Sequence, residues 1–200
     1  MKKLVFALSS LPLIYLSYQL VFNLLGPNPV SEVIHFTGAW SLRFFLITLC
    51  ITPLKNILNL AQLVKYRRML GLFAFFYLSL HFLSYSGLDL HFSWQDISHD
   101  LIKHPFVYVG FIGLVLTLPL ALTSNQYAQK KLKKNWKKLH QLAYVIPVLG
   151  VVHFWWLVKR DLTEPILYAT ILMILLGYRL IKYLSLQFVK KSQWEKLQES

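Results

Sequence analysis

Residues 67–88 read RRMLGLFAFFYLSLHFLSYSGL, an apolar run that carries a single histidine, His81, near its far end. A helix that crosses a bilayer needs about 20 consecutive, mostly apolar residues, and this run is long enough. Residues 137–158, KKLHQLAYVIPVLGVVHFWWLV, follow the same plan, with His140 at the start and His153 near the end. Imidazole is costly in hydrocarbon, so ionisable residues inside such segments predict a functional site.

The composition extends this pattern to the whole chain. The protein has 200 residues, of which 56% are hydrophobic and 14% charged, whereas a typical soluble domain carries about 25% charged residues. Six apolar segments can be marked, at 4–24, 34–54, 69–88, 105–123, 139–158 and 165–184. We therefore predict an all-α membrane protein, a six-helix bundle forming one domain over residues 1–200, with a short interfacial helix within residues 90–104.

The charges that give the net +13 are unevenly distributed, because basic and acidic residues fall in alternate loops. Lysine and arginine concentrate at both chain ends and in the loops 55–68 and 130–138, while the alternate loops hold only Lys103, Lys159 and Arg160. Those alternate loops hold six of the eight acids, namely Glu32, Asp89, Asp96, Asp100, Asp161 and Glu164. The positive-inside rule then predicts that both termini are cytoplasmic. The basic charge is a topology pattern and does not predict a nucleic-acid partner. Cys50 is the only cysteine, which excludes an intramolecular disulfide and a cysteine-ligated iron–sulfur cluster.

His81 and His153 are predicted to lie at the same depth. At the helical rise, His81 lies about 18 Å beyond Met69 and His153 about 21 Å beyond Leu139. Both segments run outward, so both histidines fall in the periplasmic half. Haem iron takes axial ligands from opposite faces of the ring, and two histidines at one level could supply them. The sequence therefore predicts a haem bound by His81 and His153; the alternative is a hydrogen bond between helices.

Two other side chains have open roles. His140 lies one residue into its segment, below six lysines, and could bind a cofactor or simply sit at the interface. Its distance of 13 residues from His153 gives a different helix face, although Pro147 between them can change the winding. Arg43 lies about 12 Å below His35, well inside the membrane. It could pair with a haem propionate or a flavin phosphate, or could snorkel to the surface.

Short motifs connect these residues to a known family. They are HFTG at 35–38, ITPL at 51–54, RRMLGL at 67–72, LH at 80–81, LTS at 122–124, Trp136, LH at 139–140 and His153. In their order and spacing, over nearly the full length, they resemble the MsrQ (formerly YedZ) family, part of the ferric reductase-like transmembrane group. The family's haem histidines correspond to His81, His140 and His153. Related ferric reductases carry a further histidine on the third helix, where this chain has Arg67 and Arg68.

The resemblance implies an electron-transfer subunit in the bacterial inner membrane. Family members bind haem b and FMN and take electrons from the respiratory quinone pool. They pass them to MsrP, a periplasmic molybdopterin-containing subunit that reduces methionine sulfoxide in oxidised envelope proteins. No substrate-reducing centre is identified in this chain, so whether it is itself an enzyme stays open. The alternative is a non-redox transporter or scaffold whose histidines bridge helices.

Overall fold

The computed structural model describes residues 1–159 and 161–198, with side chains up to Val189. Arg160 and the side chains of Lys190, Lys191 and Lys196, all part of the predicted charge pattern, lie outside the described portion. The elements in chain order are α1 (Lys2–Val21), α2 (Pro29–Leu58), the 3₁₀ turn η1 (Ala61–Leu63), α3 (Val64–Ser84), the π-helical turn η2 (Tyr85–Asp89), α4 (Trp94–Lys103), α5 (Pro105–Leu122), α6 (Gln126–Leu132), α7 (Lys134–Leu139), α8 (Leu142–Leu157) and α9 (Thr163–Gln198). All described elements are helical.

The six predicted segments are confirmed as six helices long and apolar enough to cross a membrane. The predicted short helix is also present, as α4, and it is capped by Ser93, whose side chain accepts from the Asp96 amide. The helix predicted from residue 34 starts earlier, because Asn28 caps it and Pro29 occupies its first turn. It ends at Leu58, and the capping residue Asn59 has a left-handed conformation.

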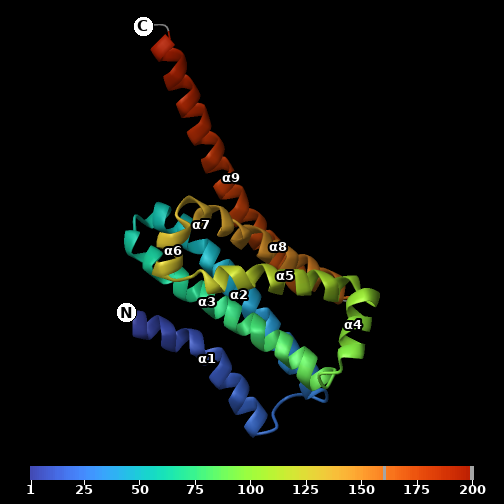
Figure 1. Ribbon diagram of the computed structural model, residues 1–200. Coiled ribbons are helices and arrows are strands. Elements are labelled where there is room, and N and C mark those ends of the chain that lie inside the picture. The colour runs from blue at the N-terminus through green and yellow to red at the C-terminus, as the bar shows by residue number, and fades with distance from the viewer. Residues whose placement is uncertain (160, 199–200) are drawn as a thin grey trace.

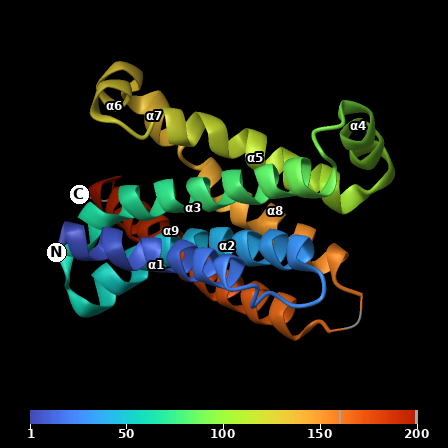
Figure 2. The same cartoon turned by 90° about the horizontal axis from the view of Figure 1, so that it is seen from below.

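Two helix pairs make up the centre of the bundle. Helix α2 packs along α3, and α5 packs along α8 (Figures 1 and 2). The core between α2 and α3 contains the stacked rings of Phe44 and Tyr77, whose centroids are 5.3 Å apart. Helix α9 covers α2 and α8, and then continues well beyond the bundle in Figure 1.

The bundle has two chemically different ends, which Figure 2 places on opposite sides. The basic end holds α6, α7 and the turn η1, with the lysines of residues 130–138. The acidic end holds η2, α4, and the first turns of α2 and α9 with the connections that precede them, and it carries six acids. Both His81 and His153 lie toward the acidic end of their helices.

One buried hydroxyl links helix α1 to α3, in addition to apolar packing by residues such as Val5 and Leu13. The Tyr77 hydroxyl of α3 donates to the Ser9 carbonyl at 3.0 Å and accepts from the Leu13 amide at 3.1 Å. It thereby takes the place of a helical hydrogen bond in the turn that contains Pro12, and a side chain inserted into the ladder in this way bends a helix. The bend of α1 is visible in Figure 1.

Candidate functional site

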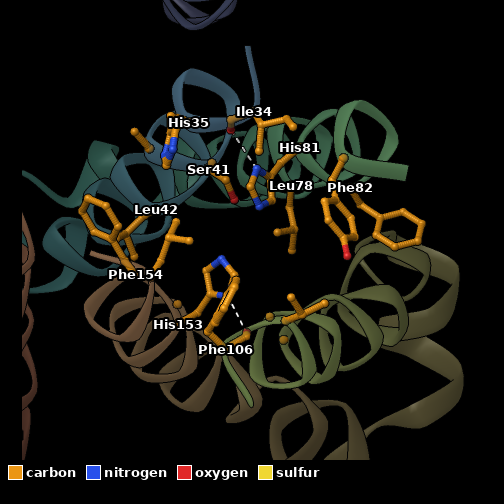
Figure 3. Close-up of a pocket in the computed structure, with 18 of the residues that line it drawn as sticks. Ile34, His35, Ser41, Leu42, Leu78, His81, Phe82, Phe106, His153 and Phe154 are labelled. Carbon is orange, nitrogen blue, oxygen red and sulfur yellow. Dashed lines mark hydrogen bonds between the residues drawn. The ribbon is translucent and has the colours of Figure 1, made fainter. Parts of the chain in front are cut away.

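A cavity of about 780 Å³ lies among α2, α3, α5 and α8, toward the acidic end. Its walls are mainly apolar, and α4 contributes to its outer margin through Ile97, Asp100 and Leu101. Ligand sites in proteins are typically apolar cavities of about 300–1,000 Å³ with a few placed polar groups. In this cavity the polar groups that face each other are His81 and His153 (Figure 3).

His81 enters the cavity from α3 and is held by α2. Its Nδ1 lies 2.8 Å from the Ile34 carbonyl oxygen. A carbonyl only accepts, so Nδ1 carries the proton and donates it. Nε2 is then the unprotonated nitrogen, the form in which imidazole binds a metal.

His153 repeats this arrangement from the opposite wall. It belongs to α8, and its Nδ1 donates to the Phe106 carbonyl of α5 at 2.6 Å. Its Nε2 is again left unprotonated. Neither Nε2 has a hydrogen-bond partner among the described residues. Metal-binding histidines commonly donate their second ring nitrogen to a backbone carbonyl in this way, which fixes the tautomer and the ring orientation.

The separation of the two rings fits a shared metal ion. Their centroids are 6.0 Å apart and their planes are nearly perpendicular, at 83°. With a nitrogen–metal bond of about 2 Å on each side and a ring centre roughly 1 Å behind each nitrogen, the centroids would be about 6 Å apart. The two histidines thus lie at one level, as the sequence depths predicted.

Arg43 also lines the cavity. Its Nε donates to the Tyr168 hydroxyl of α9 at 2.8 Å, and its guanidinium carbon lies 5.0 Å from the centre of the Trp40 ring. Within the described part of the chain, no carboxylate lies within ion-pair distance of Arg43. The side chain is therefore held in place by a neutral hydroxyl and an aromatic face, and its charge has no anionic partner there.

His140 does not line the cavity. It lies in the break between α7 and α8, with its ring stacked on Trp136 at 4.0 Å between centroids. Its Nε2 is 3.0 Å from the Thr123 hydroxyl, which itself donates to the Pro119 carbonyl at 2.6 Å. Because that hydroxyl has only one proton, it accepts from His140, so Nε2 carries the hydrogen. The prediction that His140 binds a cofactor therefore has no support from its contacts.

Of the other four histidines, two line the cavity and two do not. His35 and His104 line the outer part of the cavity, while His91 and His99 do not. The Tyr85 hydroxyl donates to Asp100 at 2.8 Å, which joins the π-helical turn to α4 beside the cavity. Sequence reasoning missed this contact and the two carbonyl acceptors. A backbone carbonyl has no sequence identity, and the Tyr85–Asp100 pair depends on the turn between them.

Comparisons with known proteins agree with this architecture. The family described as "Ferric reductase like transmembrane component" matches residues 37–151. A protein from Xanthomonas euvesicatoria pv. vesicatoria (strain 85-10), named protein-methionine-sulfoxide reductase heme-binding subunit MsrQ, is 52% identical over 161 residues, which cover 80% of this chain and 74% of that protein. A protein of the same name from Polaromonas naphthalenivorans (strain CJ2) is 45% identical over 181 residues, covering 89% of this chain and 83% of its own length. No solved structure gives a significant match. The chain is a multi-pass membrane protein that belongs to the MsrQ family of the ferric reductase-like transmembrane group.

Proposed function

We propose that this protein is a membrane electron-transfer subunit that holds a b-type haem between His81 and His153. The observation that carries the proposal is the pair of imidazoles, each fixed through Nδ1 and each presenting Nε2 to one cavity. Two relatives at 52% and 45% identity are named heme-binding subunits. When bound, a haem supplies one-electron redox chemistry.

The residues present fit such a group. The cavity supplies an apolar volume, and the two imidazoles that would hold the haem face it from opposite walls. Among the described residues no cluster of three or more histidine, cysteine or carboxylate side chains could hold a bare metal ion. A porphyrin brings its own four equatorial nitrogens, so two protein ligands suffice for it.

Arg43 is the residue we assign to an anionic group of the cofactor. The residue lines the cavity and uses Nε to bind the Tyr168 hydroxyl, so its Nη donors are left for a propionate. Our proposal gives His140 no role at this iron, because it lies outside the cavity. FMN is retained as a second cofactor on the family resemblance alone, and flavin fluorescence after denaturation is its test.

The proposed electron path runs from the respiratory quinone pool to MsrP, the periplasmic molybdopterin subunit that reduces methionine sulfoxide. The cavity lies toward the acidic end, and Asp89, Asp100 and Glu164 line it. Carboxylates at this end offer a docking surface to a partner of complementary charge. The proposal also locates the protein in the inner membrane with both termini cytoplasmic and the acidic end periplasmic.

The orientation has a direct test. A reporter fused after Ser200 should report cytoplasm, and one inserted near Asp96 in α4 should report periplasm. The reverse result would put the proposed haem near the cytoplasmic surface, and delivery of electrons to a periplasmic partner would then be excluded.

The function itself is tested by spectroscopy followed by turnover. The dithionite-reduced minus oxidised spectrum of the purified protein should contain a b-type haem band. That reduced haem should be reoxidised by the catalytic partner plus a sulfoxide substrate, and not by the substrate alone. Equal reoxidation without the partner would identify the chain as the enzyme itself.

A non-redox transporter or scaffold is the second candidate, because both histidines do bridge helices. Each bridge uses only Nδ1, however, and leaves Nε2 facing the cavity. A purely structural histidine requires no such cavity. Absence of any haem band from protein purified with adequate haem supply would favour this second candidate.

A further inference from the structure

The two histidine sites are built to one plan. In each site, the histidine lies 47 residues after the residue whose carbonyl accepts its Nδ1 proton: Ile34 for His81, and Phe106 for His153. In each site a glycine lies four residues after that carbonyl, Gly38 on α2 and Gly110 on α5. The second set of residues follows the first by 72 positions throughout. Helices α2 and α3 therefore form one half of the site, and α5 and α8 form a matching half.

Each glycine lies directly against the imidazole of its own half. A Cβ added at Gly38 would be 2.9 Å from His81 Nδ1 and 3.0 Å from its Cε1. A Cβ added at Gly110 would be 2.8 Å from His153 Nδ1 and 3.0 Å from its Cε1. These distances are shorter than an ordinary van der Waals contact of about 3.5–4 Å. An added Cβ would thus crowd the same ring atoms in both halves, beside the nitrogen that donates to the carbonyl.

No other glycine lies against a histidine within the described residues, although a Cβ at Gly87 would be as crowded, at 2.8 Å from the Phe92 ring. A Cβ at Gly71, on the same helix as His81, would meet only Thr48 Cγ2, at 3.9 Å. One at Gly177 on α9 would meet nothing within 4 Å. Close approach of helix backbones is a common reason for glycine in membrane helices. At positions 38 and 110 the group that requires the space is a side chain instead.

We infer that Gly38 and Gly110 are positioning residues for the two metal-binding imidazoles. This inference rests on the proposed haem function. Because the glycine has no side chain, the imidazole ring can lie against its backbone. In that position Nδ1 reaches the carbonyl one turn before the glycine on the same helix. That hydrogen bond fixes the proton on Nδ1, keeps Nε2 available for the iron and sets the ring plane. The methyl group of an alanine at position 38 or 110 displaces the ring and lengthens the hydrogen bond from Nδ1 to the carbonyl.

The test uses Gly38→Ala and Gly110→Ala in the full-length protein, with Gly71→Ala as the matched control. Two properties are measured: the rate of haem transfer to excess apomyoglobin, and the low-temperature EPR spectrum of the oxidised protein. Loss of outer partners of metal ligands typically weakens binding about 10–100-fold, so we expect transfer to be accelerated at least about 10-fold by either substitution. Nearly perpendicular imidazole planes give a strongly anisotropic low-spin EPR signal, and rotation of one ring should change it. Gly71→Ala should match the wild type in both properties.

A double substitution keeps the inference testable when a single variant does not accumulate. His81→Ala replaces the crowded ring by a methyl group, so Gly38→Ala should cost nothing further in that background. Gly38→Ala should remain costly in a His153→Ala background, where its own ring is intact. If Gly38→Ala lowers the yield of monodisperse protein by the same factor in the His81→Ala background as in the wild type, the inference is overturned.

The failure of this inference differs from failure of the proposed function. Wild-type protein without haem, or His81→Ala protein with a normal haem spectrum, would overturn the function. Wild-type protein with a haem bound by two histidines, together with Gly38→Ala and Gly110→Ala spectra and transfer rates equal to those of Gly71→Ala, would leave the function intact and overturn only the positioning role.

Discussion

The two ends of helix α8 hold the same residue type in opposite states. His153, near the acidic end, donates from Nδ1 to a carbonyl and presents Nε2 to a cavity of about 780 Å³. His140, just before the helix at the basic end, donates from Nε2 to Thr123 and stacks on Trp136. The first imidazole leaves Nε2 without a hydrogen bond, and we propose that it binds the metal there; the second uses the same nitrogen to join the end of α5 to the start of α8.

The comparison teaches that what a histidine can bind depends on which of its two nitrogens is already hydrogen-bonded. A carbonyl at Nδ1 frees Nε2, whose direction along the side chain lets it reach the centre of a cavity. A hydroxyl at Nε2 removes that option. Two half-buried arginines differ in a similar way. Arg179 donates both of its terminal nitrogens to the Leu49 and Leu175 carbonyls, whereas Arg43 lines the cavity and donates its Nε to the Tyr168 hydroxyl.

The largest effect is expected for the two histidines that we propose bind the iron. His81→Ala and His153→Ala should each cause near-complete loss of haem, since each removes one of two axial ligands from the same iron. His140→Ala, the matched control, should retain haem close to the wild-type amount. Haem per protein, measured by the pyridine haemochrome assay, decides this. A His140→Ala variant depleted as severely as His153→Ala would mean that the two histidines are equivalent after all.

An intermediate effect is expected at Arg43. Arg43→Leu removes the charge that we pair with an anionic cofactor group, so haem transfer to apomyoglobin should accelerate while membrane insertion is unchanged. Arg43→Lys keeps the charge but loses the guanidinium fork, and it should fall between Arg43→Leu and wild type. If haem transfer from Arg43→Leu is as slow as from the wild type, Arg43 has only a structural role through its contacts with Tyr168 and Trp40.

The smallest effect is expected at the basic end. Thr123→Val keeps the shape of the side chain but removes the oxygen that accepts from His140. Loss of such a hydrogen bond costs about 1 kcal/mol. We therefore expect a slightly lower unfolding midpoint, with unchanged haem content and spectrum. A change in the haem spectrum of Thr123→Val would connect His140 to the cofactor and contradict our assignment.

Six spanning helices, the α4 helix and the common depth of His81 and His153 could all be predicted, because hydropathy, charge and helical rise are written in the sequence. The interruption between α7 and α8, which leaves His140 outside both helices, could not be predicted from the sequence. It depends on how Trp136 and Thr123 pack around the imidazole. The carbonyls that select the tautomers belong to the backbone and leave no trace in the sequence. Gly38 and Gly110 did leave one, because each lies 43 residues before its histidine.

The most direct test of the central claim identifies the axial ligands in the unaltered protein. Near-infrared magnetic circular dichroism of the oxidised wild type separates ligation by two imidazoles from ligation by methionine, thiolate or water. We predict a single low-spin haem with two imidazole ligands, one from His81 and one from His153. A methionine or thiolate partner, or a five-coordinate high-spin iron, would contradict the account.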